Sequence, residues 1–442
     1  MRTHIRNIVF LFHLLFMPLS HADQVVVTSG RVVYDPFGRV VRVYHPTVDS
    51  ERVDSFSRAV DNVAPTRTEY DELDRPLKVI LPDGTYTTYA YSLVGNAIKT
   101  TVTDAEGNSS ATVVNGSGKT IKGIQYKGGP DSDALTTTFA YDGIGRLISV
   151  TDTEGNVTES TYDYGDRRTS VIHPASGETS YTYDRLGNVL TVQTANLKDG
   201  GSHVEYTYDR GRPTSVVYPE HPENDVSYRY GDENDDHHAK GRVILRLDGT
   251  GGLEYSYDNM GNVSRMLRTV VVPNEESAIG TFETEFTYDS YGKLLDMTYP
   301  DGEKVCYWYD SSAQLTEVYI KKKDGVHYVE EIGYDKFGDR TYIRYGDKSE
   351  TRYSYLPTTR RLSSTQISRP QVGSGPCYTL TRQYTYDDVG NITELSCSST
   401  GTGSGTGLLQ PPVTHQYMTH STASQETTAA QARRRGNPPC TA

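Results

Sequence analysis

The sequence predicts an all-β fold, an array of about 13 antiparallel β-hairpins built from repeats of roughly 21 residues. The first observation behind this prediction is a tyrosine that returns at a fixed period, usually followed by Asp and, three residues further on, by Gly. Residues 141–146 (Tyr-Asp-Gly-Ile-Gly-Arg) show the pattern, and the tyrosine returns 21 residues later at Tyr162 and again at Tyr183. A short fixed period is typical of repeat architectures rather than of separate compact domains. The successive tyrosines are Tyr70, Tyr91, Tyr141, Tyr162, Tyr183, Tyr208, Tyr230, Tyr257, Tyr288, Tyr309, Tyr334, Tyr355 and Tyr386.

The second observation is a pair of aromatic residues in most copies. The partner stands two positions before the tyrosine, as in Phe139 and Tyr141 or Tyr181 and Tyr183. Because successive side chains of a strand alternate between its faces, this spacing places both rings on one face. The chain has 35 Tyr against 9 Phe, and only 35% of its residues are apolar. We therefore expect a thin sheet rather than a large apolar core.

The third observation is that two kinds of turn alternate along the array. An Asp-x-x-Gly turn follows the aromatic pair, and an Asp-Gly or Glu-Gly turn stands half a repeat away, as at 82–84, 106–108, 154–156 and 300–302. Gly and Asn tolerate the positive φ that tight hairpin turns require. Each repeat is therefore interpreted as one hairpin.

This combination resembles the RHS or YD-repeat (tyrosine-aspartate repeat) family of bacterial surface proteins and toxins. The resemblance covers about residues 70–393, with a weaker copy at 34–39. It implies hairpins that pair side by side into one long curved or spiralling sheet, the wall of a hollow shell that encloses a toxic C-terminal segment in larger members. Their closing segment has no counterpart here, so the resemblance implies a partial shell. The repeat signature is carried by Tyr141, Asp142, Gly145, Tyr183, Asp184, Gly187, Tyr257, Asp258, Gly261, Tyr288, Asp289, Gly292, Tyr386, Asp387 and Gly390.

The N-terminal residues 1–22 have the features of a secretory signal peptide. A basic start is followed by the apolar run 8–17 and by a small-x-small site at 20–22. An uncleaved anchor is the alternative, although the apolar run is short for a membrane span. No later segment is apolar enough to cross a membrane. The prediction is export through the general secretory route to the periplasm, the cell surface or the extracellular space.

The rest of the chain divides into three parts. Residues 23–67 are an irregular β or cap region, with strands expected near 25–27 and 39–44 and a short helix over 53–63. Residues 68–396 form the repeat array, without a convincing helix and with insertions at 196–202, 232–240 and 271–280. Residues 397–442 are a low-complexity tail, interpreted as disordered.

A reading-frame shift is an alternative account of the tail. Met418 is followed by Thr419, and a frame that begins at the last base of the methionine codon reads Asp, after a codon that can encode Tyr. That frame would supply one more repeat. The hypothesis places the shift near residues 413–416.

Motifs that carry chemistry are weak in this sequence. Residues 115–120 (Asn-Gly-Ser-Gly-Lys-Thr) look like the end of a phosphate-binding loop, but Val113 stands where that loop needs Gly, so a hairpin turn is preferred. Asp232, Asp235, Asp236, His237 and His238 can be a metal cluster or, as we prefer, a hydrated loop. We therefore predict no catalytic, metal or cofactor site. The net charge of −13 also disfavours nucleic-acid binding.

Four cysteines are present: Cys306, Cys377, Cys397 and Cys440. Cys377 and Cys397 lie on either side of the turn at 387–391, so a disulfide between neighbouring strands is one interpretation in an oxidising compartment, and free thiols are the other.

The predicted function is a non-catalytic, exported structural repeat protein. In the terms of the resemblance it is the wall of a shell that encloses, delivers or presents a toxin or another C-terminal polypeptide. The alternative is a cell-surface module whose exposed tyrosines bind carbohydrate or protein.

Overall fold

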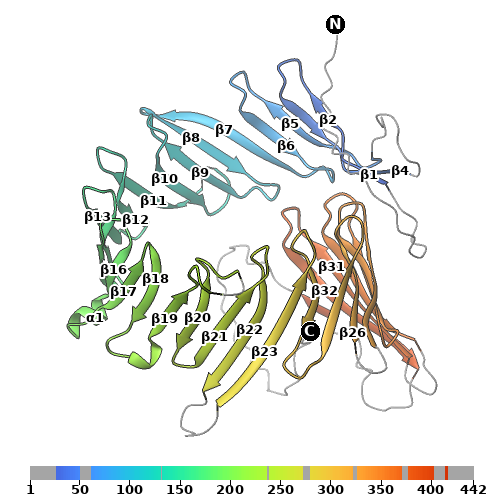
Figure 1. Ribbon diagram of the computed structural model, residues 1–442. Helices are drawn as coiled ribbons and strands as arrows, with labels where there is room; N and C mark the ends of the chain where they lie inside the picture. The colour runs from blue at the N-terminus through green and yellow to red at the C-terminus, as the bar shows by residue number, and fades with distance from the viewer. Residues whose placement is uncertain are drawn as a thin grey trace, which may run out of the picture.

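The computed structural model describes residues 26–49, 61–130, 132–235, 238–271, 279–321, 326–370, 377–402 and 414–416. The predicted signal peptide and most of the predicted helix at 53–63 lie outside these residues, as does most of the tail. The all-β prediction is confirmed: the described chain consists almost entirely of antiparallel strands (Figure 1).

The strands follow one another with short connections. The strands are β1 Val26–Thr28, β2 Val32–Tyr34, β3 Val40–Val43, β4 Thr47–Asp49, β5 Thr66–Tyr70, β6 Pro76–Ile80, β7 Tyr86–Val94, β8 Ala97–Thr103, β9 Ser109–Val114, β10 Thr120–Tyr126, β11 Ala134–Tyr141, β12 Leu147–Thr151, β13 Val157–Tyr162, β14 Arg168–His173, β15 Gly177–Tyr183, β16 Val189–Gln193, β17 Val204–Asp209, β18 Arg212–Val217, β19 Val226–Tyr230, β20 Val243–Asp248, β21 Gly251–Tyr257, β22 Val263–Val271, β23 Ile279–Tyr288, β24 Leu294–Thr298, β25 Lys304–Tyr309, β26 Leu315–Lys321, β27 Val326–Tyr334, β28 Arg340–Tyr345, β29 Glu350–Tyr355, β30 Leu362–Arg369, β31 Cys377–Tyr386, β32 Ile392–Thr402 and β33 Thr414–Gln416. The described helices are α1 Ala195–Asp199 and the 3-10 turn η1 Pro222–Asn224.

All strands except β1 and β4 belong to one open sheet. Each strand pairs antiparallel with the next along the chain, except that β3 pairs with β5, while β1 and β4 pair with each other. Among the described strands, β2 pairs with β3 alone and β33 with β32 alone, so these two are the ends of the sheet. Local hairpin pairing, as the repeat predicted, therefore builds the whole sheet.

A β-bulge marks the signature tyrosine in nearly every copy, which periodicity alone did not predict. One residue is skipped on the partner strand, as where Ala140 faces Ser149 but Tyr141 faces Leu147. A bulge increases the local twist of its hairpin. Tyr91 has no following Asp, and its hairpin β7–β8 closes in regular register with Val94 opposite Ala97. The shift occurs at Tyr34, Tyr70, Tyr141, Tyr162, Tyr183, Tyr208, Tyr230, Tyr257, Tyr288, Tyr309, Tyr334, Tyr355 and Tyr386.

The sheet is thin, as the composition predicted. The aromatic face is half-buried, whereas the residues between the rings, such as Thr182 and Thr207, are exposed. Hydroxyl groups bond across strands on this second face, for example Thr182 to Thr191 at 2.6 Å. Few described hydrophobic side chains are buried, and Val329, Ile332 and Ile343 on strands β27 and β28 form a small buried cluster among them.

The regions outside the regular repeats differ in part from expectation. The predicted insertion at 196–202 contains the single turn α1, and the one at 271–280 extends the long hairpin β22–β23. Residues 397–402, assigned to the tail, continue β32, and β33 adds a further paired strand. No described helix has the length and apolar character needed to cross a membrane.

The sheet curves until its late repeats meet its first ones (Figure 1). The backbone amide of Asp388 donates to Glu106 Oε1 at 3.1 Å, and Lys336 forms an ion pair with Asp61. The rings of His45 and Phe337 meet edge to face with centroids 5.1 Å apart. These contacts join segments more than 270 residues apart in sequence and define a seam.

Candidate functional site

The aspartate of the signature closes its own turn. In the turn after β11, Asp142 Oδ1 accepts the backbone N–H groups of Ile144 at 3.1 Å and Arg146 at 2.9 Å. The amide of Gly145 donates to the Asp142 carbonyl at 3.0 Å. Gly145 has φ +90°, in the region that favours glycine. The spacing Asp-x-x-Gly is therefore a requirement of the turn.

The second carboxylate oxygen binds the residue after the glycine. Arg146 Nε donates to Asp142 Oδ2 at 2.6 Å, and Asn188 Nδ2 donates to Asp184 Oδ2 at 2.7 Å. Hydrogen bonds from the Arg146 amide and side chain hold the pKa of Asp142 below its ordinary value, and the Asn188 side chain does the same for the pKa of Asp184. The turns at Asp258, Asp289 and Asp387 also bind backbone amides through Oδ1.

The tyrosine of the signature binds the preceding repeat. Tyr141 donates its hydroxyl to the carbonyl of Thr120 at 2.9 Å, and Tyr257 donates to that of Val243 at 2.6 Å. Burial raises the pKa of Tyr257 and of Tyr288, which holds the same strand position. The same bond is made by Tyr70, Tyr91, Tyr162, Tyr183, Tyr230, Tyr309, Tyr334, Tyr355 and Tyr386.

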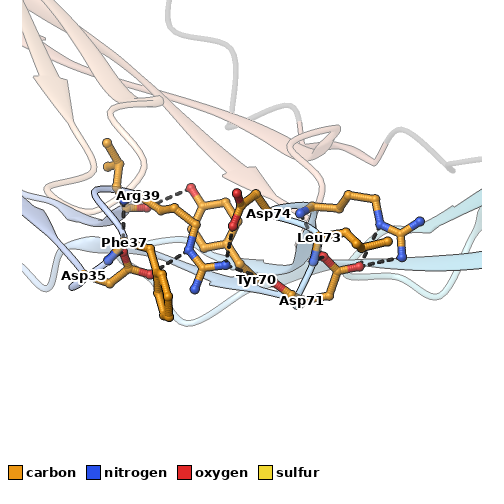
Figure 2. A network of polar contacts seen from close by, with 9 residues as sticks. Asp35, Phe37, Arg39, Tyr70, Asp71, Leu73 and Asp74 are labelled. Carbon is orange, nitrogen blue, oxygen red and sulfur yellow. Dashed lines mark hydrogen bonds and ion pairs between the residues drawn. The ribbon is translucent and has the colours of Figure 1, made fainter.

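A cation from one repeat covers the tyrosine ring of the next. Figure 2 shows Arg39 bonded to Asp35 in its own turn and to the Asp71 carbonyl and Asp74 in the following turn. Its guanidinium lies 5.0 Å from the centroid of the Tyr70 ring. Arg146 and Arg167 repeat this geometry over Tyr162 and Tyr183, each at 5.1 Å. The signature tyrosines therefore contact neighbouring repeats through both the ring and the hydroxyl group.

The RHS Repeat family profile matches residues 70–109 and 141–178. Both segments contain the hairpins and turns described above, and the resemblance found in the sequence is confirmed. These two segments of the chain are RHS repeats.

Two curated relatives resemble part of this RHS-repeat chain. The tRNA nuclease WapA of Bacillus subtilis is 28% identical over 215 residues, and the tRNA3(Ser)-specific nuclease WapA of Bacillus spizizenii is 29% identical over 207 residues. In both cases the match covers 44% of this chain and 8% of the relative. The chain therefore corresponds to a small part of these proteins.

Solved structures share the fold over most of the chain. The crystal structure of TcdB2-TccC3 has a TM-score of 0.69 and 21% identity, and the match covers 85% of this chain and 20% of that one. The Tc holotoxin pore of Photorhabdus luminescens has a TM-score of 0.68 and 20% identity over 84% of this chain and 19% of that one. This likeness shows the fold of the RHS sheet.

Cys377 and Cys397, interpreted from the sequence either as a disulfide or as free thiols, are not bridged in this structure. Cys377 lies opposite Thr402 and Cys397 opposite Arg382, so the two cysteines are offset along the β31–β32 ladder. Both are free, as is Cys306. The sequence-based interpretation treated the two cysteines as symmetric about the turn at 387–391. It did not include the bulge at Tyr386, nor the unequal distances of Cys377 and Cys397 from that turn.

The insertion after β19 is organised by ion pairs and a bridge. Lys240 pairs with Glu233 at 2.8 Å, and Gly231 pairs with Lys240 in an isolated β-bridge. Asp235 accepts the backbone amide of Asp232. Asp236 and His237 lie outside the described residues, and the described part of the chain has no group of three metal-ligating side chains.

One repeat copy, the turn at 115–119, was not recognised as a repeat from the sequence. Asn115 replaces the signature aspartate between β9 and β10, and its Oδ1 accepts the amides of Ser117 and Lys119 at 3.0 Å each. The stretch that looks like a phosphate loop is thus a hairpin turn, as predicted. The signal was the Asn-x-x-Gly-Lys spacing, which a search for Tyr-Asp does not detect.

Proposed function

We propose that this chain is a non-catalytic wall of an RHS-type shell and that it encloses or presents another polypeptide. The observation that carries the proposal is the single-layered sheet that curves until late repeats contact early ones. A wall needs a continuous sheet rather than a thick core. Backbone pairing between strands, together with the side-chain bonds between repeats, makes the sheet continuous. The described chain has only a small buried cluster in which a deep site could be built.

The bonds between repeats also disfavour the carbohydrate-binding alternative for the signature tyrosines. An aromatic ring that stacks on a sugar needs one free face. Here the rings are half-buried and several carry an Arg or Lys side chain from the preceding repeat, while their hydroxyls are used within the sheet. We infer that these tyrosines hold the wall together.

The comparisons support the shell, and we propose that the nuclease activity named for the two relatives does not extend to this chain. The matched segment is 8% of each WapA protein, and the proposal assigns this chain a structural role alone. The likeness to the Tc holotoxin pore, in which the match covers 19% of that chain, is consistent with a toxin or other polypeptide as cargo. Residues 1–22 are proposed to direct export.

A protection experiment tests enclosure. The DNA through codons 400–442 would first be resequenced, and every downstream frame translated, because β33 fits the expectation of a further repeat. The chain joined to the resulting downstream polypeptide would be treated with a broad-specificity protease and fragments followed by mass spectrometry. We expect the downstream polypeptide to survive much longer than the same polypeptide expressed alone. Equal digestion rates would reject enclosure.

The unique tryptophan tests the alternative function. Trp308 is 56% exposed and stands on the hydroxyl-bearing face of β25. Titration with a panel of glycans should leave its fluorescence unchanged if the sheet is a wall. A saturable response would instead support a carbohydrate-binding face.

A further inference from the structure

The two rims of the sheet differ, and they meet at the seam. The signature rim carries the turns that follow a signature tyrosine, such as 142–146, 335–339 and 387–391. The opposite rim carries the turns that no signature tyrosine precedes, such as 104–108 and 152–156, and the segment that leads into β5. At the seam the signature rim of the late repeats touches the opposite rim of the first repeats.

The main contact of the seam joins one turn to two early segments. Lys336 Nζ pairs with Asp61 Oδ2, and the two side chains are 24% and 10% exposed. The ring of the next residue, Phe337, lies nearly perpendicular to the His45 ring, at an interplanar angle of 87°. His45 Nδ1 is buried without a described hydrogen-bond partner. The ion pair and the ring contact therefore lie side by side.

Arg360 supports this turn from the neighbouring hairpin. Its guanidinium lies 4.0 Å from the centroid of Phe337 and pairs with Asp335 and with Asp339, the latter at 2.7 Å. Arg360 has φ +62°, at the turn position that glycine takes in most copies. Ala313 holds the same turn position with φ +72°, so Arg360 is distinguished by its contacts to the seam turn rather than by its backbone.

Phe337 is covered by His45 from across the seam and by Arg360 from the neighbouring hairpin. The same turn position holds Ile144, which is 71% exposed, and Leu186, which is 78% exposed. Phe337 is half-buried. Equivalent turns elsewhere thus expose their apolar tip residue to water. In the turn at 335–339 the tip residue contacts His45 and Arg360 instead.

No described strand pairing crosses the seam, because β2, β3 and β5 pair only with one another and with β6 on this side. The described seam is therefore held by side chains and by the single Asp388 amide. We propose that His45, Asp61, Lys336, Phe337 and Arg360 form a clasp that keeps the curved sheet closed and that opens while every hairpin stays paired. The inference rests on the proposed function, in which an open clasp provides a passage for the enclosed polypeptide.

A cross-linking reporter tests closure apart from the clasp residues. Glu106→Cys and Asp388→Cys would be introduced together in a chain whose native cysteines are replaced by Ser, and the rate of cross-linking by a short bismaleimide measured. The matched control pair is Glu154→Cys with Asp388→Cys, because Glu154 holds the same place as Glu106 in an equivalent turn. The reporter should cross-link at least about tenfold faster than the control. Equal rates would overturn the proposal.

Clasp variants are then placed in the reporter chain. Lys336→Glu puts two carboxylates together and should slow cross-linking by about threefold or more. Asp61→Lys added to Lys336→Glu should restore the rate, and Phe337→Ala should slow it. Leu186→Ala, at the equivalent exposed tip, should leave it unchanged.

Circular dichroism and Trp308 fluorescence show whether each variant keeps its hairpins. Unchanged cross-linking in both Lys336→Glu and Phe337→Ala would overturn the clasp, as would loss of strand signal together with cross-linking. If either charged variant does not fold, the cross-linking rates of the Phe337→Ala and Leu186→Ala variants are compared instead. Equal rates for these two variants would then overturn the clasp. The readout needs no cargo, so a failed clasp is distinguishable from a failed protection experiment.

Discussion

Residues 134–183 and residues 326–369 are built from the same repeat but are stabilised differently. In the first stretch only Ser170 is buried and the turn tips project into solvent. In the second, Val329, Ile332 and Ile343 form a buried cluster, and the tip of the turn at 335–339 is covered by the seam. The repeat thus supplies a uniform ladder, and additional packing is concentrated where the ladder closes on itself.

The second stretch also contains a copy that departs from the signature. Tyr355 is followed by Leu356 rather than Asp, and Arg360 occupies the position of the glycine. Arg361 keeps the usual arginine role, since it donates to the Asp387 carbonyl at 3.1 Å and faces Tyr386. Departures from a repeat therefore indicate where one copy has acquired a contact of its own.

The largest expected difference between the stretches concerns the core. Ile332→Ala should lower the free energy of unfolding by about 2–4 kcal/mol, because it removes buried methyl groups and leaves a cavity. Ile148→Ala, at a partly exposed position of the first stretch, should cost less than about 1 kcal/mol. Urea denaturation followed by circular dichroism measures both. Similar losses would mean that the cluster does not distinguish the two stretches.

A smaller effect is expected from the tyrosine hydroxyls. Tyr257→Phe removes the bond to the Val243 carbonyl and should cost about 1 kcal/mol, because the half-buried carbonyl loses its donor. Tyr291→Phe changes a turn tip that is 88% exposed and should have almost no effect. The same denaturation experiment compares them, and a loss confined to Tyr291→Phe would contradict the assigned role.

The seam should respond to pH near neutrality, whereas the regular turns should respond only in acid. Burial, together with the nearby charges of Lys336 and Arg360, lowers the pKa of His45, and only Asp61 opposes them. Opening returns His45 to an ordinary pKa of about 6.5, so the open form gains the proton first. Closure is therefore complete above about pH 7 and weakens as the pH falls through about 6.5. Asp335 and Asp339, paired with Arg360, are the other charged groups facing this site.

Cross-linking of the Glu106→Cys, Asp388→Cys reporter should consequently slow by a few-fold between about pH 7.5 and pH 5.5, after correction for thiol reactivity with the control pair. His45→Gln should remove this dependence. A reporter rate that keeps its pH dependence in His45→Gln would exclude His45 as the sensor.

The smallest expected effect is that of one turn carboxylate in acid. The pKa of Asp142 is lowered in the folded chain, so its contribution is present above the unfolded value near about 3.9 and is lost as the pH falls towards the folded value. Asp142→Asn should therefore lower thermal stability at pH 7 and make less difference at about pH 3. Asp199→Asn, on the exposed turn of α1, is the matched control. An equal effect of Asp142→Asn at both pH values would contradict this account.

Much of the fold could be predicted because the contacts that build it are local. The Tyr-Asp-x-x-Gly spacing correctly indicated antiparallel hairpins in one thin sheet, since each strand pairs with its neighbour along the chain. The partners of those residues were not predicted, because the Tyr257 hydroxyl reaches a carbonyl of the preceding repeat. The register of Cys377 and Cys397 was also missed, since symmetry about a turn does not reveal a bulge.

The sequence by itself determined the hairpin, its period and its turns, because these depend on alternation, glycine conformation and side chains within a few residues of one another. Only the tertiary structure decided where the sheet closes. Closure depends on twist that accumulates over many hairpins, each contributing a small rotation. Nothing in the sequence distinguishes the turn tip at Phe337 from the equivalent tip at Leu186. Only the curvature of the sheet brings His45 and Asp61 to the turn that contains Phe337.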